Sequence, residues 1–170
     1  MTSNLPDKKS SAQDIQAFIS KVKNTLPVTG EGKGRLIFAM DATASREHCW
    51  DMASQQHAAM FAEADKVSAL SVQLCYYRGM GEFKALPWTR GADEIKQALL
   101  SVNCLGGKTQ IAKVLSHALS ETRSDKVNAL VFIGDCVEEN PDSLAALAGQ
   151  LGLLNLPLFI FQEANTPGVV

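Results

Sequence analysis

Two uninterrupted apolar runs, each followed by an aspartate, place the strongest constraint on how this chain can fold. Residues 36–40 are Leu-Ile-Phe-Ala-Met, followed by Asp41, and residues 129–133 are Ala-Leu-Val-Phe-Ile, followed by Gly134 and Asp135. Apolar residues in succession, without the alternation of a half-exposed strand, indicate a β-strand covered on both faces. Residues 156–161 predict a third buried strand of this kind.

Helical patterns alternate with these strands. Residues 47–64, 93–102 and 111–119 carry apolar side chains at helical spacing, the last of these after the glycines at 106 and 107, and Asn140-Pro141 predicts the start of a helix that runs to Gly152. Residues 67–78 predict another strand, on which residues 83–89 can pair back. This order predicts an α/β fold: a doubly wound, mostly parallel sheet with helices on both faces and one antiparallel edge strand.

The predicted domain covers residues 34–163. Residues 1–33 are expected to contain a mobile tail, one helix over residues 15–26 and a glycine-rich connector. Residues 164–170 are expected to form a second tail.

Composition argues against several classes of function. A net charge of −2 without a basic stripe argues against nucleic-acid binding. The first nine residues have no apolar core, so we expect no signal peptide there. The longest apolar stretch, residues 151–161, contains Gly152, Asn155 and Pro157, so no membrane span is expected. Four cysteines show neither Cys-x-x-Cys nor zinc-site spacing, which favours reduced thiols in a cytoplasmic protein.

Residues 105–109, Leu-Gly-Gly-Lys-Thr, resemble the end of a phosphate-binding P-loop. That motif requires a glycine five residues before its Gly-Lys pair, where this chain has Val102, and it requires a strand, not a helix, before the loop. We therefore expect no nucleotide to bind through Lys108, and Thr109 must have another role.

Oxygen-bearing side chains follow the predicted buried strands. Asp41, Thr43 and Ser45 come after the first, Asp135 after the strand of residues 129–135, and Thr109 near the start of a helix. Ligands bind beyond the carboxyl ends of the strands in such a sheet. Two carboxylates and three hydroxyls suit a hard divalent cation such as Mg²⁺, with Mn²⁺ or Ca²⁺ as alternatives. Each motif taken alone is also common in ordinary turns and helix caps.

This arrangement resembles a von Willebrand factor A (vWA) domain with its metal-ion-dependent adhesion site, in particular bacterial stand-alone vWA-containing proteins. Asp41, Thr43 and Ser45 match the family's Asp-x-Ser-x-Ser run, Thr109 its loop threonine, and Asp135 its final aspartate. The resemblance covers residues 34–163 and implies a non-enzymatic interaction module. In such a module a partner protein offers an Asp or Glu as the last ligand of the metal, which the hydroxyls would bind directly or through water and the aspartates mostly through water.

The chain departs from the family pattern in several places. Thr43 replaces a serine, Cys136 stands where a glycine is usual, and Lys108 adds a positive charge beside Thr109. We also expect no counterpart of the family's last helix and strand in residues 162–170. Glu138 and Glu139 are expected to lie on a solvated face. Two alternatives remain open: a Mg²⁺-assisted phosphohydrolase, and a scaffold domain that has lost its metal.

Overall fold

The computed structural model describes residues 17, 21, 34–65 and 70–162. Of the helix expected over residues 15–26 only Ala17 and Lys21 are described, both as helical, and the two tails lie outside the described residues.

Five strands form one sheet in the order β3-β2-β1-β4-β5. β1 lies in the centre and pairs in parallel with β2 and β4, while β5 pairs in parallel with β4 and β3 pairs antiparallel with β2. The strands are β1 (Arg35–Asp41), β2 (Ser71–Arg78), β3 (Glu82–Ala85), β4 (Ala129–Gly134) and β5 (Leu158–Gln162). The predicted fold class, with its antiparallel edge strand, is confirmed.

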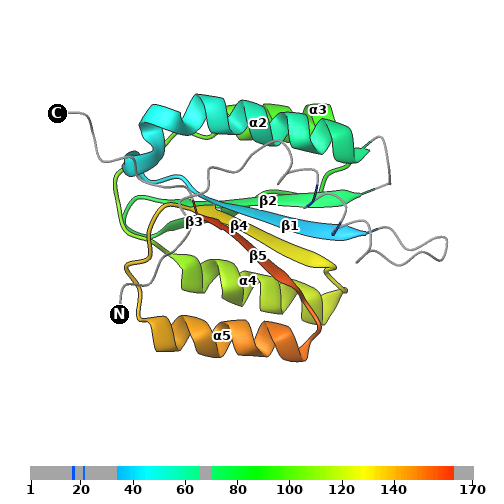
Figure 1. Ribbon diagram of the computed structural model, residues 1–170, viewed down its shortest axis with the longest axis vertical. Helices are drawn as coiled ribbons and strands as arrows, with labels where there is room; N and C mark the ends of the chain where they lie inside the picture. Colours follow the sequence, from blue (N-terminus) through cyan, green and yellow to red (C-terminus); the bar gives the residue numbers. More distant parts are fainter. Residues whose placement is uncertain (1–16, 18–20, 22–33, 66–69, 163–170) are drawn as a thin grey trace.

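Helices cover both faces of the sheet, α2 and α3 on one side and α4 and α5 on the other (Figure 1). Their bounds are α2 (Glu47–Asp65), α3 (Ala92–Ser101), α4 (Ile111–Ser124) and α5 (Pro141–Leu153), and a short 3-10 helix, η1 (Ala44–Arg46), precedes α2. As predicted, the Asn140 side chain caps α5 by accepting hydrogen bonds from the Asp142 and Ser143 amides. No helix in the described part of the chain is both long enough and apolar enough to cross a membrane.

The two helical layers explain the uninterrupted apolar run of β1. Phe38 and Met40 point into the core under α2 and α3, whereas Ile37 and Ala39 point into the core under α4 and α5. Successive residues of a strand face opposite sides of the sheet. Because each side is covered by helices, every position in this run is buried and apolar.

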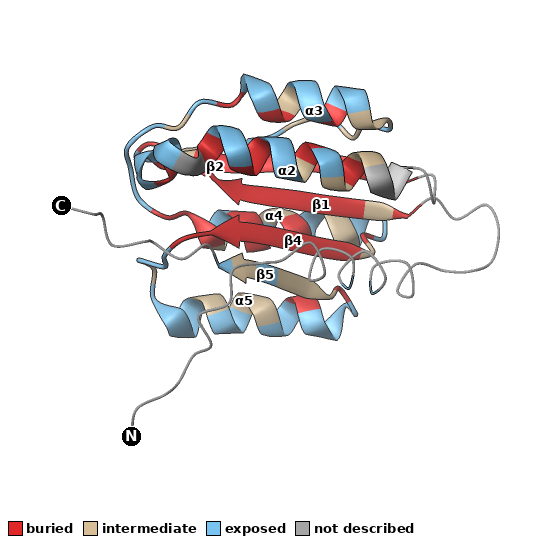
Figure 2. Ribbon diagram, turned by 45° about the horizontal axis from the view of Figure 1, so that its top comes forward, coloured by how far each residue is buried: buried red, intermediate tan, exposed pale blue. Residues whose placement is uncertain are grey.

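β5 differs from the prediction of a third buried strand. Its residues are only half-buried or exposed, and Ile160 is 64% exposed, in contrast to the buried β1 and β4 (Figure 2). The reason is its place at the end of the strand order, where β4 is its only paired neighbour among the described residues. Within residues 34–65 and 70–162, β5 is thus an edge strand of the sheet.

The two kinds of strand position predict different mutational costs. We expect Ile37→Ala, at a fully buried central site, to lower the free energy of unfolding by about 2–5 kcal/mol through lost burial and a residual cavity. Ile160→Ala removes the same atoms from an exposed edge and should change it by less than about 0.5 kcal/mol. Urea unfolding of both variants measures the difference, and equal losses would contradict the layer assignment.

Candidate metal centre

The carboxyl ends of the parallel strands lie at one end of the sheet, where their arrowheads point in Figure 2. Asp41 ends β1 and Asp135 directly follows β4, and the two strands are hydrogen-bonded neighbours with Met40 opposite Ile133. A Cβ built on Gly134 would lie 3.5 Å from the Cβ of Asp41. The structure therefore brings the two aspartates to neighbouring strand ends, as the sequence predicts.

Asp41 organises the turn that follows β1. Its Oδ1 atom accepts two hydrogen bonds from Thr43, one from the backbone N–H at 2.8 Å and one from the hydroxyl at 2.5 Å. The Thr43 and Ser45 hydroxyl oxygens lie 3.2 Å apart. Asp41 and Thr43 are buried, while Ser45 is exposed. Three of the five predicted ligands thus form one connected group that is open to solvent at Ser45.

Tyr77 holds the other oxygen of Asp41. The β1–β2 register places Tyr77 opposite Asp41, and the phenol donates to Oδ2 at 3.1 Å. Burial, and next the charge of Asp41, raise the pKa of Tyr77 far above its ordinary value, so the phenol keeps its proton and acts as a donor.

A buried arginine, Arg46, also donates a hydrogen bond to this turn. Arg46 is 1% exposed, and its Nη1 donates to the backbone carbonyl of Asp41 at 2.6 Å. Its guanidinium lies 5.3 Å from the centre of the Trp50 ring, and the Trp50 Nε1 donates to the carbonyl of Val102 at 2.9 Å. This chain of contacts connects the turn after β1 to the segment that follows α3.

The loop between α3 and α4 is fixed against two other loops of the site. The Leu105 N–H donates to the Ala42 carbonyl at 3.0 Å, and the Lys108 N–H donates to the Gly79 carbonyl at 3.2 Å. Gly107 passes so close to this backbone that an added Cβ would lie 1.7 Å from the Gly79 oxygen. Glycine at 107 therefore permits close packing of two backbones, which is a different use from cradling a phosphate.

Thr109 lies just before α4, which begins at Ile111 and not at the preceding glycines. It exchanges two hydrogen bonds with Glu138: the Thr109 N–H donates to Oε2 at 2.9 Å, and the Glu138 N–H donates to the Thr109 hydroxyl at 3.0 Å. The next residue, Glu139, accepts from the N–H groups of Ile111 and Ala112 at 2.6 and 2.9 Å. Glu138 is exposed and Glu139 is half-buried, and both carboxylates also accept hydrogen bonds from amides around the start of α4, a role that the sequence did not predict.

This capping bears on the P-loop question. A helix N-terminus binds phosphate through its free amides and the positive end of its dipole. Here the carboxylate of Glu139 already occupies the first two amides of α4. A phosphate would have to displace a charged group that belongs to the chain itself.

The carboxylate of Asp135, unlike that of Asp41, is buried without strong hydrogen-bond donors in the described part of the chain. It is 6% exposed, and within the described residues neither of its carboxylate oxygens has a hydrogen-bond partner. The Cys136 thiol lies close by, but a thiol is only a weak donor. A buried carboxylate without partners is costly. A cation at this position would remove that cost, so the residues present fit a divalent ion.

The charges of the site support the same fit. Burial is the main cause that raises the pKa of Asp41; hydrogen bonds from Thr43 and Tyr77 lower it, and the charge of Asp135 raises it further. A carboxyl group whose pKa is raised on folding costs stability as the pH rises through that pKa, because it must then ionise in the folded state. Desolvation, with the charges of Asp135 and Asp41, raises the pKa of Cys136 to about 11, so this thiol stays protonated near neutral pH.

The ligand set consists of oxygens alone. Across residues 34–65 and 70–162, no three or more His, Cys, Asp or Glu side chains gather into a group that could hold a metal. The candidate centre therefore depends on hydroxyl oxygens in addition to its two carboxylates, a donor set that suits Mg²⁺ and similar hard ions.

Four residues of this region were not identified from the sequence as parts of the site: Arg46, Tyr77, Glu138 and Glu139. An arginine and two glutamates are typical surface residues, and the position of Tyr77 depends on the β1–β2 register. The one usable signal was the pair of adjacent carboxylates three residues after Asp135.

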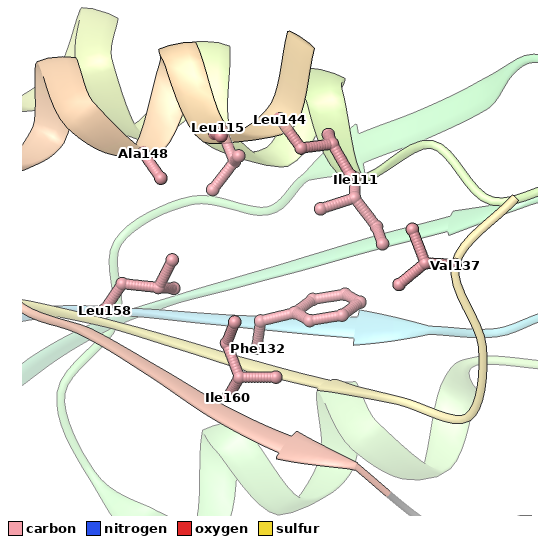
Figure 3. A pocket seen from close by; sticks show the side chains of 9 residues that line it. Ile111, Leu115, Phe132, Val137, Leu144, Ala148, Leu158 and Ile160 are labelled. Atoms are coloured by element: carbon pink, nitrogen blue, oxygen red, sulfur yellow. The ribbon is translucent and has the colours of Figure 1, made fainter. Parts of the chain in front are cut away.

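The loop after β4 also borders an apolar groove. Val137 is 58% exposed and forms one wall of this groove, whose volume is about 200 Å³ (Figure 3). The other walls come from α4, α5, the edge strand β5 and its neighbour β4. One short loop therefore contributes Asp135 to the candidate metal centre and Val137 to the groove.

Three solved structures show the same fold. A von Willebrand factor type A protein from Catenulispora acidiphila matches with a TM-score of 0.59 at 15% identity, over 76% of this chain and 33% of that one. The PilB minor pilin from Streptococcus sanguinis, solved as a mutant, matches with 0.55 at 14%, over 64% and 31%. The pilus adhesin SpaC from Lactobacillus rhamnosus GG, in an open conformation, matches with 0.52 at 13%, over 63% and 15%.

At these identities the similarity shows the fold alone. The chain spans no more than a third of the length of each of these three structures. No protein-family model and no curated protein matches the sequence.

The two glycines before Lys108 should respond differently to a methyl group. We expect Gly107→Ala to lower the free energy of unfolding by about 1–3 kcal/mol, because backbone must move away from the new Cβ. Gly106→Ala is the control, since its Cβ would meet only the Ala44 Cβ at 3.8 Å, an ordinary contact. Urea unfolding compares them, and a tolerated Gly107→Ala would contradict the close approach to Gly79.

The occupied amides of α4 predict that ATP and GTP do not bind through Lys108. Lys108→Ala should leave any residual nucleotide affinity unchanged in isothermal titration. Micromolar ATP binding by the wild type that disappears in Lys108→Ala would show that the loop works as a P-loop after all.

Proposed function

We propose that this chain is a non-enzymatic, metal-dependent protein-interaction module. Its site would hold a divalent cation, Mg²⁺ or else Mn²⁺ or Ca²⁺, and a partner protein would add an Asp or Glu to the same ion. The proposed metal-site residues are Asp41, Thr43, Ser45, Thr109 and Asp135.

The observation that carries this proposal is the state of Asp135. It is a buried carboxylate with no hydrogen-bond partner in the described part of the chain, at the strand end next to a second buried carboxylate. Such a pair is unfavourable without a positive charge nearby. The oxygen-rich turn beside it supplies what a hard cation needs.

The other residues have separable roles. Asp41 orients the Thr43 hydroxyl through their 2.5 Å hydrogen bond, and Ser45 extends the group toward solvent. The hydroxyl of Thr109 is placed by the Glu138 amide and keeps a lone pair for a further contact. When bound, the cation would supply a positive centre that attracts an acidic side chain of the partner.

The names of the structural neighbours support an interaction role. One is a von Willebrand factor type A protein, and two belong to pili: an adhesin and a minor pilin. The alternative of a Mg²⁺-assisted phosphohydrolase requires a place for the substrate phosphate, and the amides at the start of α4 are already taken by Glu139.

Metal binding is tested by stability. A ligand that binds only the folded state should stabilise it by about 2.7 kcal/mol at a hundredfold excess over its dissociation constant. We therefore expect Mg²⁺ or Mn²⁺ to raise the melting temperature of the wild type. Asp135→Asn should abolish this rise without lowering the stability of the metal-free protein, because it removes a buried charge that has no partner.

Asp51→Asn is the matched control, since Asp51 is exposed on α2 and should leave the metal-dependent gain unchanged. Absence of both a melting-temperature shift and a heat of binding, across millimolar Mg²⁺, Mn²⁺ and Ca²⁺, would refute the proposal. The metal-free scaffold would then be the remaining interpretation.

A further inference from the structure

The two aspartates of the site are held in opposite ways. Both oxygens of Asp41 accept hydrogen bonds from within the chain, Oδ1 from Thr43 and Oδ2 from Tyr77. Neither oxygen of Asp135 accepts one from an N–H or O–H group in the described residues, where the weakly donating Cys136 thiol is its neighbour. Asp41 is therefore fixed in orientation before any ion arrives, whereas Asp135 has most of its accepting capacity left.

The position of Tyr77 in the sheet places its hydroxyl at the carboxyl end of β1. It is fully buried, and its ring stacks on Phe132 of β4 with centroids 6.2 Å apart and planes at 22°. β1 lies between β2 and β4, so the tyrosine ring crosses over the central strand and brings its hydroxyl to the Asp41 carboxylate. The contact is set by the strand register and by ring packing, with no mobile loop involved.

We infer that Tyr77 is a positioning residue of the metal centre: its hydroxyl fixes the Asp41 carboxylate, which in turn aims the Thr43 hydroxyl, and Asp135 is left to meet the cation. This inference rests on the proposed function. It assigns to a buried tyrosine on β2 a role that none of the five predicted ligands fills.

The competing interpretation is that the Tyr77–Asp41 hydrogen bond only stabilises the fold. The two views differ in what Tyr77→Phe does. The variant keeps the ring and its packing on Phe132 but removes the donor to Oδ2. A purely structural bond would change the stability of the metal-free protein and leave the metal affinity unchanged, whereas a positioning bond must change the affinity.

The experiment is isothermal titration of Mg²⁺ into the wild type, Tyr77→Phe and Tyr76→Phe. Tyr76→Phe is the matched control, because Tyr76 is the preceding residue of β2, is also buried, and packs in the core on the opposite face of the sheet. Loss of a group that orients a metal ligand typically weakens metal binding by about 10–100-fold. We expect that loss in Tyr77→Phe and unchanged affinity in Tyr76→Phe.

A second measurement does not depend on the fate of Tyr77→Phe. The chain has two tyrosines, so Tyr76→Phe labelled with ¹³Cζ-tyrosine gives a single NMR resonance, that of Tyr77. Mg²⁺ should shift this resonance, because the ion changes the charge on the carboxylate that accepts the phenol hydrogen. Asp135→Asn in the same background should abolish the shift.

The outcomes separate the inference from the proposed function. Wild-type binding together with equal affinity in Tyr77→Phe, or with a Tyr77 resonance that does not move, overturns the inference and leaves the metal site standing. Absence of Mg²⁺ binding by the wild type refutes the proposed function and removes the inference with it.

Discussion

The fully buried carboxylate of Asp41 is the constraint around which one end of this molecule is organised. A charged group withdrawn from water must be given hydrogen-bond donors, and Asp41 receives them from the turn after β1 and from the neighbouring strand β2. The backbone carbonyl of the same residue anchors the buried Arg46. A single residue, through its side chain and its backbone carbonyl, therefore connects the turn after β1, the residue before α2 and strand β2.

A second organising contact joins the α3–α4 loop to the loop after β4. Thr109 and Glu138 exchange hydrogen bonds, and Glu139 caps α4, although each of these pairs is separated by more than 25 residues in the chain. The amides at the start of α4 need acceptors, and a neighbouring loop supplies them. The position of Thr109 relative to the two aspartates thus depends on a loop that also forms one wall of the apolar groove.

The sequence allowed the central architecture to be predicted because its strongest patterns are local. The apolar runs of β1 and β4 gave the buried strands, the Asn140-Pro141 pair gave the start of α5, and the shared location of Asp41 and Asp135 followed from the parallel sheet. Four residues that shape the site, Arg46, Tyr77, Glu138 and Glu139, could not be identified from such local patterns. The burial of Arg46 reverses its usual surface preference, and the Tyr77 contact depends on register.

The wrong prediction that β5 is a buried strand also arises because burial depends on segments distant in the sequence. Its apolar run has the composition of a buried strand, but the exposure of Ile160 is decided by the absence of a further paired neighbour in the described sheet, which is a non-local fact. The hydrogen bonds of the two glutamates after Asp135 were similarly not predicted, because the backbone N–H groups that donate to them lie on a segment remote in sequence. Local patterns identify what a residue prefers, whereas its role here depends on the segment that packs against it.

Four carboxylates lie at this one end of the sheet, Asp41 at the end of β1 and Asp135, Glu138 and Glu139 on the segment after β4. Their negative charges attract cations and repel acidic side chains. Under the proposed function, binding is therefore ordered: the ion must arrive first, because an acidic partner that approaches the bare surface meets like charge. Loss of the ion then weakens the complex, because the two acidic surfaces again repel each other. The concentration of the free ion therefore controls how much of the complex forms.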